Sequence, residues 1–139
     1  MDQNNKDQNK RDIDTIDAYL RKMSFNPDEL KKAPNIWKIT QNKAEIFVIV
    51  AGGFIILQSK IMNCPKSNIT TLYRKILELN DNVEQSLGAA FGINKNNEII
   101  LKMLRPMSNL GLNDFIYYLT SIAFVADQQM KELRGRFGD

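Results

Sequence analysis

Histidine is absent from this chain of 139 residues, and cysteine occurs once, as Cys64. Without histidine, the chain lacks the commonest general base, the commonest transition-metal ligand and the side chain that titrates near neutral pH. A single cysteine excludes an intrachain disulfide and every zinc site built on cysteine pairs. Cys64 precedes Pro65 just after an apolar run, and we interpret it as a small buried residue, because a nucleophilic thiol needs an activating neighbour.

Sequence patterns that signal catalysis or phosphate binding are also missing. Gly52-Gly53 is not followed by a lysine and a hydroxyl residue, so it is no phosphate-binding loop. Asp12, Asp14 and Asp17 suit the first turns of a helix, whose dipole favours negative charge there, and no calcium-loop pattern contains them. We therefore expect a protein that is not an enzyme, with no catalytic residues, no cofactor and no metal site.

Charge of either sign is only weakly in excess. The formal net charge is +3, with 19 basic and 16 acidic residues interspersed along the chain. Nucleic-acid binders usually concentrate basic residues on one face or stripe, and the nearest candidate here is the segment 131–136. Phe47 and Phe54 beside Lys43 and Lys60 would also offer aromatic faces for base stacking. Binding to nucleic acid or another acidic surface is therefore the alternative function, although we expect other partners.

Long hydrophobic runs and targeting signals are absent as well. Residues 1–11 are polar and of low complexity, without the features of a secretory signal, so we expect a disordered tail followed by one domain over 12–139. The most apolar stretch, residues 45–62, is shorter than the roughly 20 apolar residues of a bilayer-crossing helix, and it contains Gln58 and Lys60. We expect no membrane span and a cytoplasmic protein.

The stretch from Glu45 to Met62 is the most informative part of the chain. Two β-branched and aromatic runs flank Gly52-Gly53, whose access to positive φ angles predicts a tight hairpin. A strand with one wet face alternates apolar and polar residues, whereas both faces of this hairpin are apolar. One face carries Ile46, Val48, Val50, Ile55, Leu57 and Ile61, and the other carries Phe47, Ile49, Phe54 and Ile56. Both faces therefore need cover.

Periodicity predicts the remaining elements. Apolar residues at helical spacing indicate helices over about 12–23, 69–79 and 114–133, with Asn68 and either Ser108 or Asn113 as N-caps. Alternation indicates a strand over 36–40, with Trp37 and Ile39 facing inward, and a second hairpin formed by 89–93 and 98–103. The expected fold class is α+β, a two-layer sandwich in which helices pack on an antiparallel sheet of about five strands, in the order α-β-β-β-α-β-β-α.

The second half of the chain resembles a known family. The resemblance rests on a helix over 72–80 that ends in asparagine, the strand pair 89–93 and 98–103, the segment 105–110 with its Arg-Pro start, and a long closing helix. In these features the chain resembles the YbjN-like family and the structurally related class I type III secretion chaperones. The resemblance implies a small, non-enzymatic α+β protein, usually dimeric, and in the secretion chaperones apolar patches hold an unfolded segment of a client protein.

These observations predict a protein-binding module with a chaperone-like or regulatory role, acting as a homodimer. The residues expected to contact another chain are Phe47, Ile49, Phe54 and Ile56, or the opposite set if the helices cover that face instead. Such a contact would explain an apolar excess, because large exposed apolar patches on a soluble protein usually mark an interface. The competing interpretation is that helices of the same chain cover both faces of the hairpin.

Overall fold

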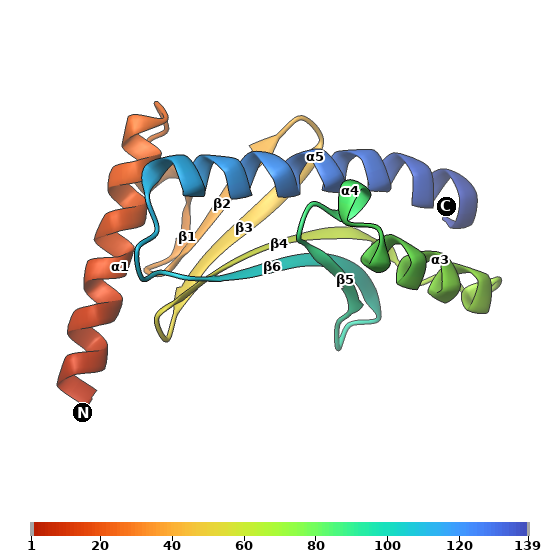
Figure 1. The fold of residues 1–139 in the computed structure, drawn as a ribbon, viewed down its shortest axis with the longest axis horizontal. Coiled ribbons are helices and arrows are strands. Elements are labelled where there is room, and N and C mark those ends of the chain that lie inside the picture. Colours follow the sequence, from red (N-terminus) through yellow and green to blue (C-terminus); the bar gives the residue numbers. More distant parts are fainter. Residues whose placement is uncertain (1, 139) are drawn as a thin grey trace.

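One antiparallel sheet with helices packed on one face makes up the computed structural model, which describes residues 2–138 (Figure 1). The helices are α1 (Asp2–Lys22), α2 (Pro27–Leu30), α3 (Ile69–Asp81), α4 (Val83–Ser86) and α5 (Leu112–Phe137). The strands are β1 (Lys31–Ala33), β2 (Ile36–Gln41), β3 (Ala44–Ala51), β4 (Phe54–Asn63), β5 (Ala90–Ile93) and β6 (Glu98–Pro106). The fold class is α+β, a two-layer sandwich, as predicted.

The sheet has six strands in the order β1-β2-β3-β4-β6-β5, and all neighbouring strands run antiparallel. The chain order follows the prediction, with the short elements α2, β1 and α4 added. β1 was not predicted, because its three residues do not alternate between apolar and polar. It pairs with the start of β2, where Lys31 lies opposite Trp37. β1 and β5 are the two edges of the sheet.

Alternation along the strands separates a covered face from an open face. In β3 the residues at even positions are buried, whereas Glu45 and Ala51 are exposed and Phe47 and Ile49 are half-buried. Trp37 and Ile39 of β2 are fully buried, as predicted. The covered face joins one continuous core with α1, α3 and α5, in which the largest fully buried side chains are Trp37, Phe115, Ile16, Leu20, Ile39, Ile46, Ile55, Leu57, Ile61, Leu72, Leu79 and Ile99.

The first helix is longer than the sequence indicated. α1 includes residues 2–11, the segment for which the sequence predicts a disordered tail, and Met1 lies outside the described residues. Side-chain hydrogen bonds at helical spacing accompany these turns: Gln8 Nε2 donates to Asp12 Oδ1 over 2.8 Å, and Arg11 Nη2 donates to Gln8 Oε1 over 3.0 Å. Pairs at this spacing stabilise a polar helix without burial of apolar surface.

Of the two predicted helix caps, Asn68 does occupy the N-cap position of α3, whereas the predicted cap of α5 is wrong. Asn68 adopts a left-handed conformation with φ of 56° and makes no side-chain capping bond to α3. At the start of α5 neither Ser108 nor Asn113 is the cap: the N-cap is Gly111, whose backbone N–H donates to Asp114 Oδ2 over 3.0 Å. A carboxylate at the third helical position can satisfy this donor by itself, so a polar side chain at the cap is dispensable.

Candidate protein-binding face

The open face of the sheet carries an apolar row that runs across four strands. Ile36 of β2 pairs with Ile49 of β3, Ile49 pairs with Ile56 of β4, and Ile56 pairs with Leu104 of β6. A second, shorter row follows from Ala51 through Phe54 to Pro106. We call the residues of these two rows, together with Phe47, the open-face patch. Cross-strand neighbours of this kind lie in side-chain contact, so the patch is continuous.

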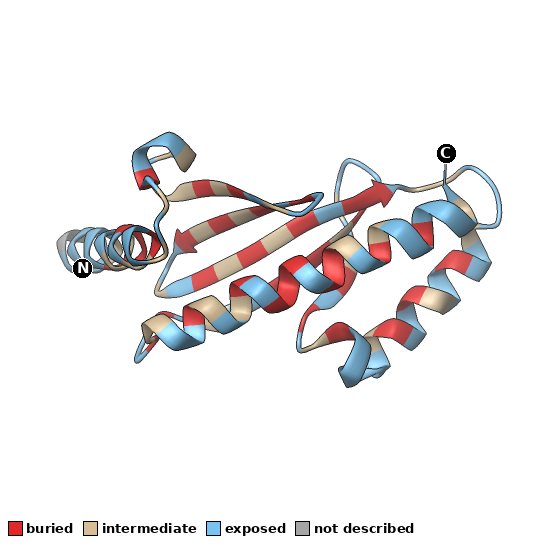
Figure 2. Ribbon diagram, turned by 90° about the horizontal axis from the view of Figure 1, so that it is seen from above, coloured by how far each residue is buried: buried red, intermediate tan, exposed pale blue. Residues whose placement is uncertain are grey.

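All four residues singled out from the sequence lie in the open-face patch. Phe47, Ile49 and Ile56 are half-buried, and Phe54 is 44% exposed. The opposite set lies beneath the helices, where Figure 2 shows the buried residues along the strands that face α5 (Figure 2). The helices of this chain therefore cover one side of the hairpin, and the interpretation in which they cover both sides does not hold for residues 2–138.

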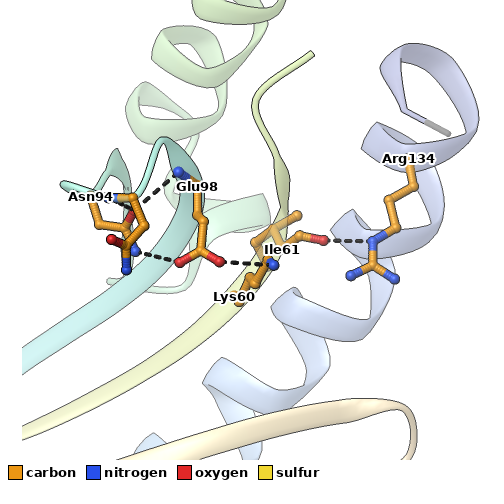
Figure 3. Close-up of polar contacts among 6 residues, drawn as sticks. Lys60, Ile61, Asn94, Glu98 and Arg134 are labelled. Atoms are coloured by element: carbon orange, nitrogen blue, oxygen red, sulfur yellow. Dashed lines mark hydrogen bonds and ion pairs between the residues drawn. The ribbon is translucent and has the colours of Figure 1, made fainter.

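Ion pairs border the open-face patch. Lys38 Nζ lies 3.4 Å from Glu45 Oε2, and Lys60 Nζ lies 2.8 Å from Glu98 Oε2. Glu98 also accepts a hydrogen bond from Asn94 Nδ2 over 2.8 Å, as Figure 3 shows (Figure 3). The hydrogen bond from Asn94 and the ammonium group of Lys60 lower the pKa of Glu98 below its usual range. The patch is thus apolar at its centre and charged at its rim.

A second exposed apolar area lies where α3 meets the edge strand β5. Leu77 is 68% exposed, Ile93 is 46% exposed, and Tyr73 adds part of its ring. These side chains line a groove of about 340 Å³ whose other walls are Ile76, Asn80, Phe91 and Gly92. The sequence did not reveal this area, because Leu77 belongs to the apolar residues whose helical spacing predicts the helix over 69–79 and so looks like a core residue. The sequence did contain a signal for this area, because the apolar residues of the helix over 69–79 cover a wider stripe than one packed face requires.

Cys64 and the carboxylates are the remaining groups that could react or bind a metal ion. Burial raises the pKa of the half-buried Cys64 thiol, which keeps it protonated near neutral pH. Among residues 2–138, no three cysteine, aspartate or glutamate side chains gather in a way that would hold a metal ion. None of the helices over the same residues is long and apolar enough to cross a bilayer.

The fold is an α+β sandwich in which the helices leave one face of the sheet uncovered. Residues 9–134 match the family model CesT_Tir_1. The chain therefore belongs to this family of type III secretion chaperones, which confirms the resemblance found in the sequence. No curated protein sequence gives a significant match.

Solved structures show the same fold at low sequence identity. The ExoU–SpcU complex from the type III secretion system of Pseudomonas aeruginosa matches with a TM-score of 0.67 and 8% identity, covering 84% of this chain and 95% of the other. The ExsC–ExsE complex matches with a TM-score of 0.63 and 11% identity, covering 85% of this chain and 92% of the other. YbjN from E. coli matches with a TM-score of 0.60 and 10% identity, covering 88% of this chain and 90% of the other.

Proposed function

We propose that this protein is a non-enzymatic chaperone that holds an extended, apolar segment of another protein on its open-face patch. The observation that carries the proposal is the row from Ile36 to Leu104, which crosses four strands on the face that α1, α3 and α5 leave bare. Isoleucine and phenylalanine side chains there would lose solvent contact against a partner, and burial of such apolar surface drives association.

Solved relatives of the same fold support a protein as the partner. The ExsC–ExsE and ExoU–SpcU structures are complexes, and a further structure with a TM-score of 0.63 at 13% identity is described as the HopA1–SchA chaperone–effector complex. An extended segment suits the patch, because a strand presents alternate side chains to one surface and apolar residues of the sheet face it at the same spacing.

Affinity capture from native lysate with mass spectrometry tests the proposal. We expect the unmodified chain to retain proteins that Phe54→Asp and Ile56→Asp variants release, since a buried unpaired carboxylate opposes apolar docking. The matched control is Phe124→Asp, which places the same charge at a 60% exposed aromatic residue of α5, away from the patch. If all three variants retain the same proteins as the unmodified chain, the open-face patch is not the binding surface.

We further propose that the protein acts as a homodimer through α3 and β5. β5 is an edge strand whose Ile93 is exposed beside Leu77. Asn80 already occupies the outward backbone groups of Phe91, so exposed apolar side chains would make the contact with a second copy. This arrangement leaves the open-face patch free for the client. Light scattering over a concentration range should give a dimer for the unmodified chain and a monomer for Leu77→Asp. If the unmodified chain stays monomeric at every concentration, the homodimer proposal is wrong, but the proposal for the client site is unaffected.

A further inference from the structure

Strands β3 and β4 separate before either of them ends. Their pairing runs from Ala51 opposite Phe54 to Phe47 opposite Gln58 and stops there, although β3 begins at Ala44 and β4 continues to Asn63. The irregular register between Lys60 and Met62 against β6 indicates a β-bulge in this stretch. A bulge bends its strand and increases the local twist, which explains why β4 turns away from β3.

Helix α5 reaches into the opening that results. Arg134 Nε donates a hydrogen bond of 2.7 Å to the carbonyl oxygen of Ile61, a bond across 73 residues of sequence, and Figure 3 shows the side chain extending from α5 to β4 (Figure 3). This bond occupies a β4 carbonyl at the level where β3 no longer pairs with β4. The guanidinium group is thereby fixed at the wall of the opening.

Two hollows lie along the part of β4 that pairs with β6 but no longer with β3. The larger, of about 310 Å³, is lined by Lys43, Glu45, Phe47, Lys60, Met130 and Arg134. The smaller, of about 150 Å³, is lined by Lys60, Met62, Asn63, Arg134 and Gly138. They share Lys60 and Arg134, so we treat them as one groove, which we call the β3–β4 groove. Its larger hollow contains three cations and one carboxylate.

The positive charge of the groove is incompletely neutralised. Within residues 2–138, neither Lys43 nor Arg134 takes part in an ion pair, and Lys60 pairs with Glu98 outside the larger hollow. Among residues 2–138, Glu45 is the carboxylate that lines the groove, and it lies 3.4 Å from Lys38. Asp127 lies beside the groove, where its Oδ1 accepts a hydrogen bond from the backbone N–H of Lys43 over 3.4 Å. Because the Nε edge of Arg134 is committed to Ile61, its remaining N–H groups are already oriented for an anion.

We propose that the β3–β4 groove binds the carboxylate of an acidic side chain in the partner segment whose apolar residues occupy the open-face patch. Phe47 belongs to both surfaces, so one extended chain can lie on both. This inference rests on the proposed function and adds the chemistry of the partner: an apolar strand followed by aspartate or glutamate. A lysine or arginine at that position is disfavoured, because like charges would be brought together in a partly desolvated site.

Binding of three synthetic peptides to the purified full chain tests this inference. Each peptide alternates valine and serine, carries a fluorophore, and ends in glutamate, glutamine or lysine with an amidated C-terminus. Fluorescence anisotropy should show the glutamate peptide binding about three-fold more tightly than the glutamine peptide, as expected for a partly exposed ion pair. The lysine peptide should bind more weakly than both, and added salt should reduce these differences.

Two variants assign the effect to the groove. Lys43→Gln should remove most of the preference for glutamate and leave the glutamine peptide unaffected, since the Lys43 side chain is exposed and supports no ion pair of the fold. Lys131→Gln is the matched control: it removes the same charge from an exposed position on α5 that does not line the groove, and it should change neither affinity.

The outcomes separate this inference from the proposed function. Equal affinity for all three peptides, lost in Ile56→Asp but not in Lys43→Gln, overturns the carboxylate site and leaves the open-face patch in place. A glutamate preference that Lys43→Gln abolishes while Ile56→Asp has no effect upholds the groove and overturns the patch. No binding of any peptide, or tighter binding of a single-stranded oligonucleotide than of the glutamate peptide, overturns the inference.

Discussion

Trp37 donates the hydrogen of its indole Nε1 to Oδ1 of Asp17 over 2.9 Å, which ties β2 to the covering helix α1. The other carboxylate oxygen lies 3.3 Å from Lys31 Nζ on β1. The same ammonium group lies 5.7 Å from the centre of the indole ring. Asp17 is thus a buried carboxylate satisfied from two strands, and it accounts for the position of the short edge strand β1.

Replacing Trp37 by phenylalanine should lower the free energy of unfolding by about 1–3 kcal/mol, because the buried Asp17 loses a hydrogen bond to a charged acceptor. Urea unfolding followed by circular dichroism measures the loss, since the variant has no tryptophan for fluorescence. In an Asp17→Asn background, Trp37→Phe should lower the free energy of unfolding by a smaller amount. Equal costs in both backgrounds would show that indole volume, not the hydrogen bond, is what matters.

Glu98 should make the stability of the protein depend on pH. Its pKa in the folded protein is lowered, first by the hydrogen bond from Asn94 and then by Lys60. A group of this kind stabilises the fold fully above its unfolded pKa of about 4.3, and the contribution disappears as the pH falls through the lower folded value. Unfolding curves of Glu98→Gln should therefore lie below those of the unmodified chain at pH 7 and approach them near pH 3. A constant gap would contradict this.

Asn80 acts as a strand-like partner for the edge strand β5. Phe91 N–H donates to Asn80 Oδ1 over 2.7 Å, and Asn80 Nδ2 donates back to the Phe91 carbonyl over 3.2 Å. Asn80→Ala leaves both backbone groups without their partner and should cost about 1–3 kcal/mol. Amide hydrogen exchange at Phe91 should accelerate. Thr71→Ala, at an exposed position on the same helix, serves as the control and should leave this exchange unchanged.

The turn between β3 and β4 requires left-handed backbone at two successive positions. Gly52 has φ of 59° and Gly53 has φ of 83°, and a Cβ atom added at either position would have no atom within 4 Å apart from those of its chain neighbours. Backbone conformation alone therefore decides the effect of substitution. Gly52→Asn should be nearly neutral, whereas Gly52→Val should cost about 1–2 kcal/mol, measured by thermal unfolding. Equal melting temperatures for the two variants would show that the turn can change its conformation.

The central hairpin could be predicted because its signals are local. Gly52-Gly53 marks the turn, and the alternation on each side separates Phe47 and Ile49 from the buried residues without knowledge of other elements. Which of the two faces the helices would cover was not encoded in the hairpin itself. That choice depends on how α1 and α5 pack, so the sequence alone leaves both sets of residues as candidates.

The β3–β4 groove could not be predicted, because it arises from distant parts of the chain. Lys43 and Lys60 flank the hairpin, but Arg134 joins them only through the crossing of α5 over β4. The separation of the strands depends on a bulge opposite Ile99 and Ile100. Residues 58–63 contain no glycine or proline that would indicate a bulge there. From the sequence, the basic segment 131–136 is a candidate only for binding nucleic acid or another acidic surface, and nothing in it places Arg134 beside β4.

Helix α5 has a consequence for the order in which the molecule can assemble during its synthesis. The covered face of the sheet closes only when Phe115, Leu119 and Ile122 dock, and these residues follow every strand in the chain. A nascent chain that has emerged only as far as β6 therefore exposes apolar side chains on both faces of its sheet. Such species aggregate readily. Before α5 docks, this protein therefore exposes the same kind of apolar surface that it is proposed to cover in its partners.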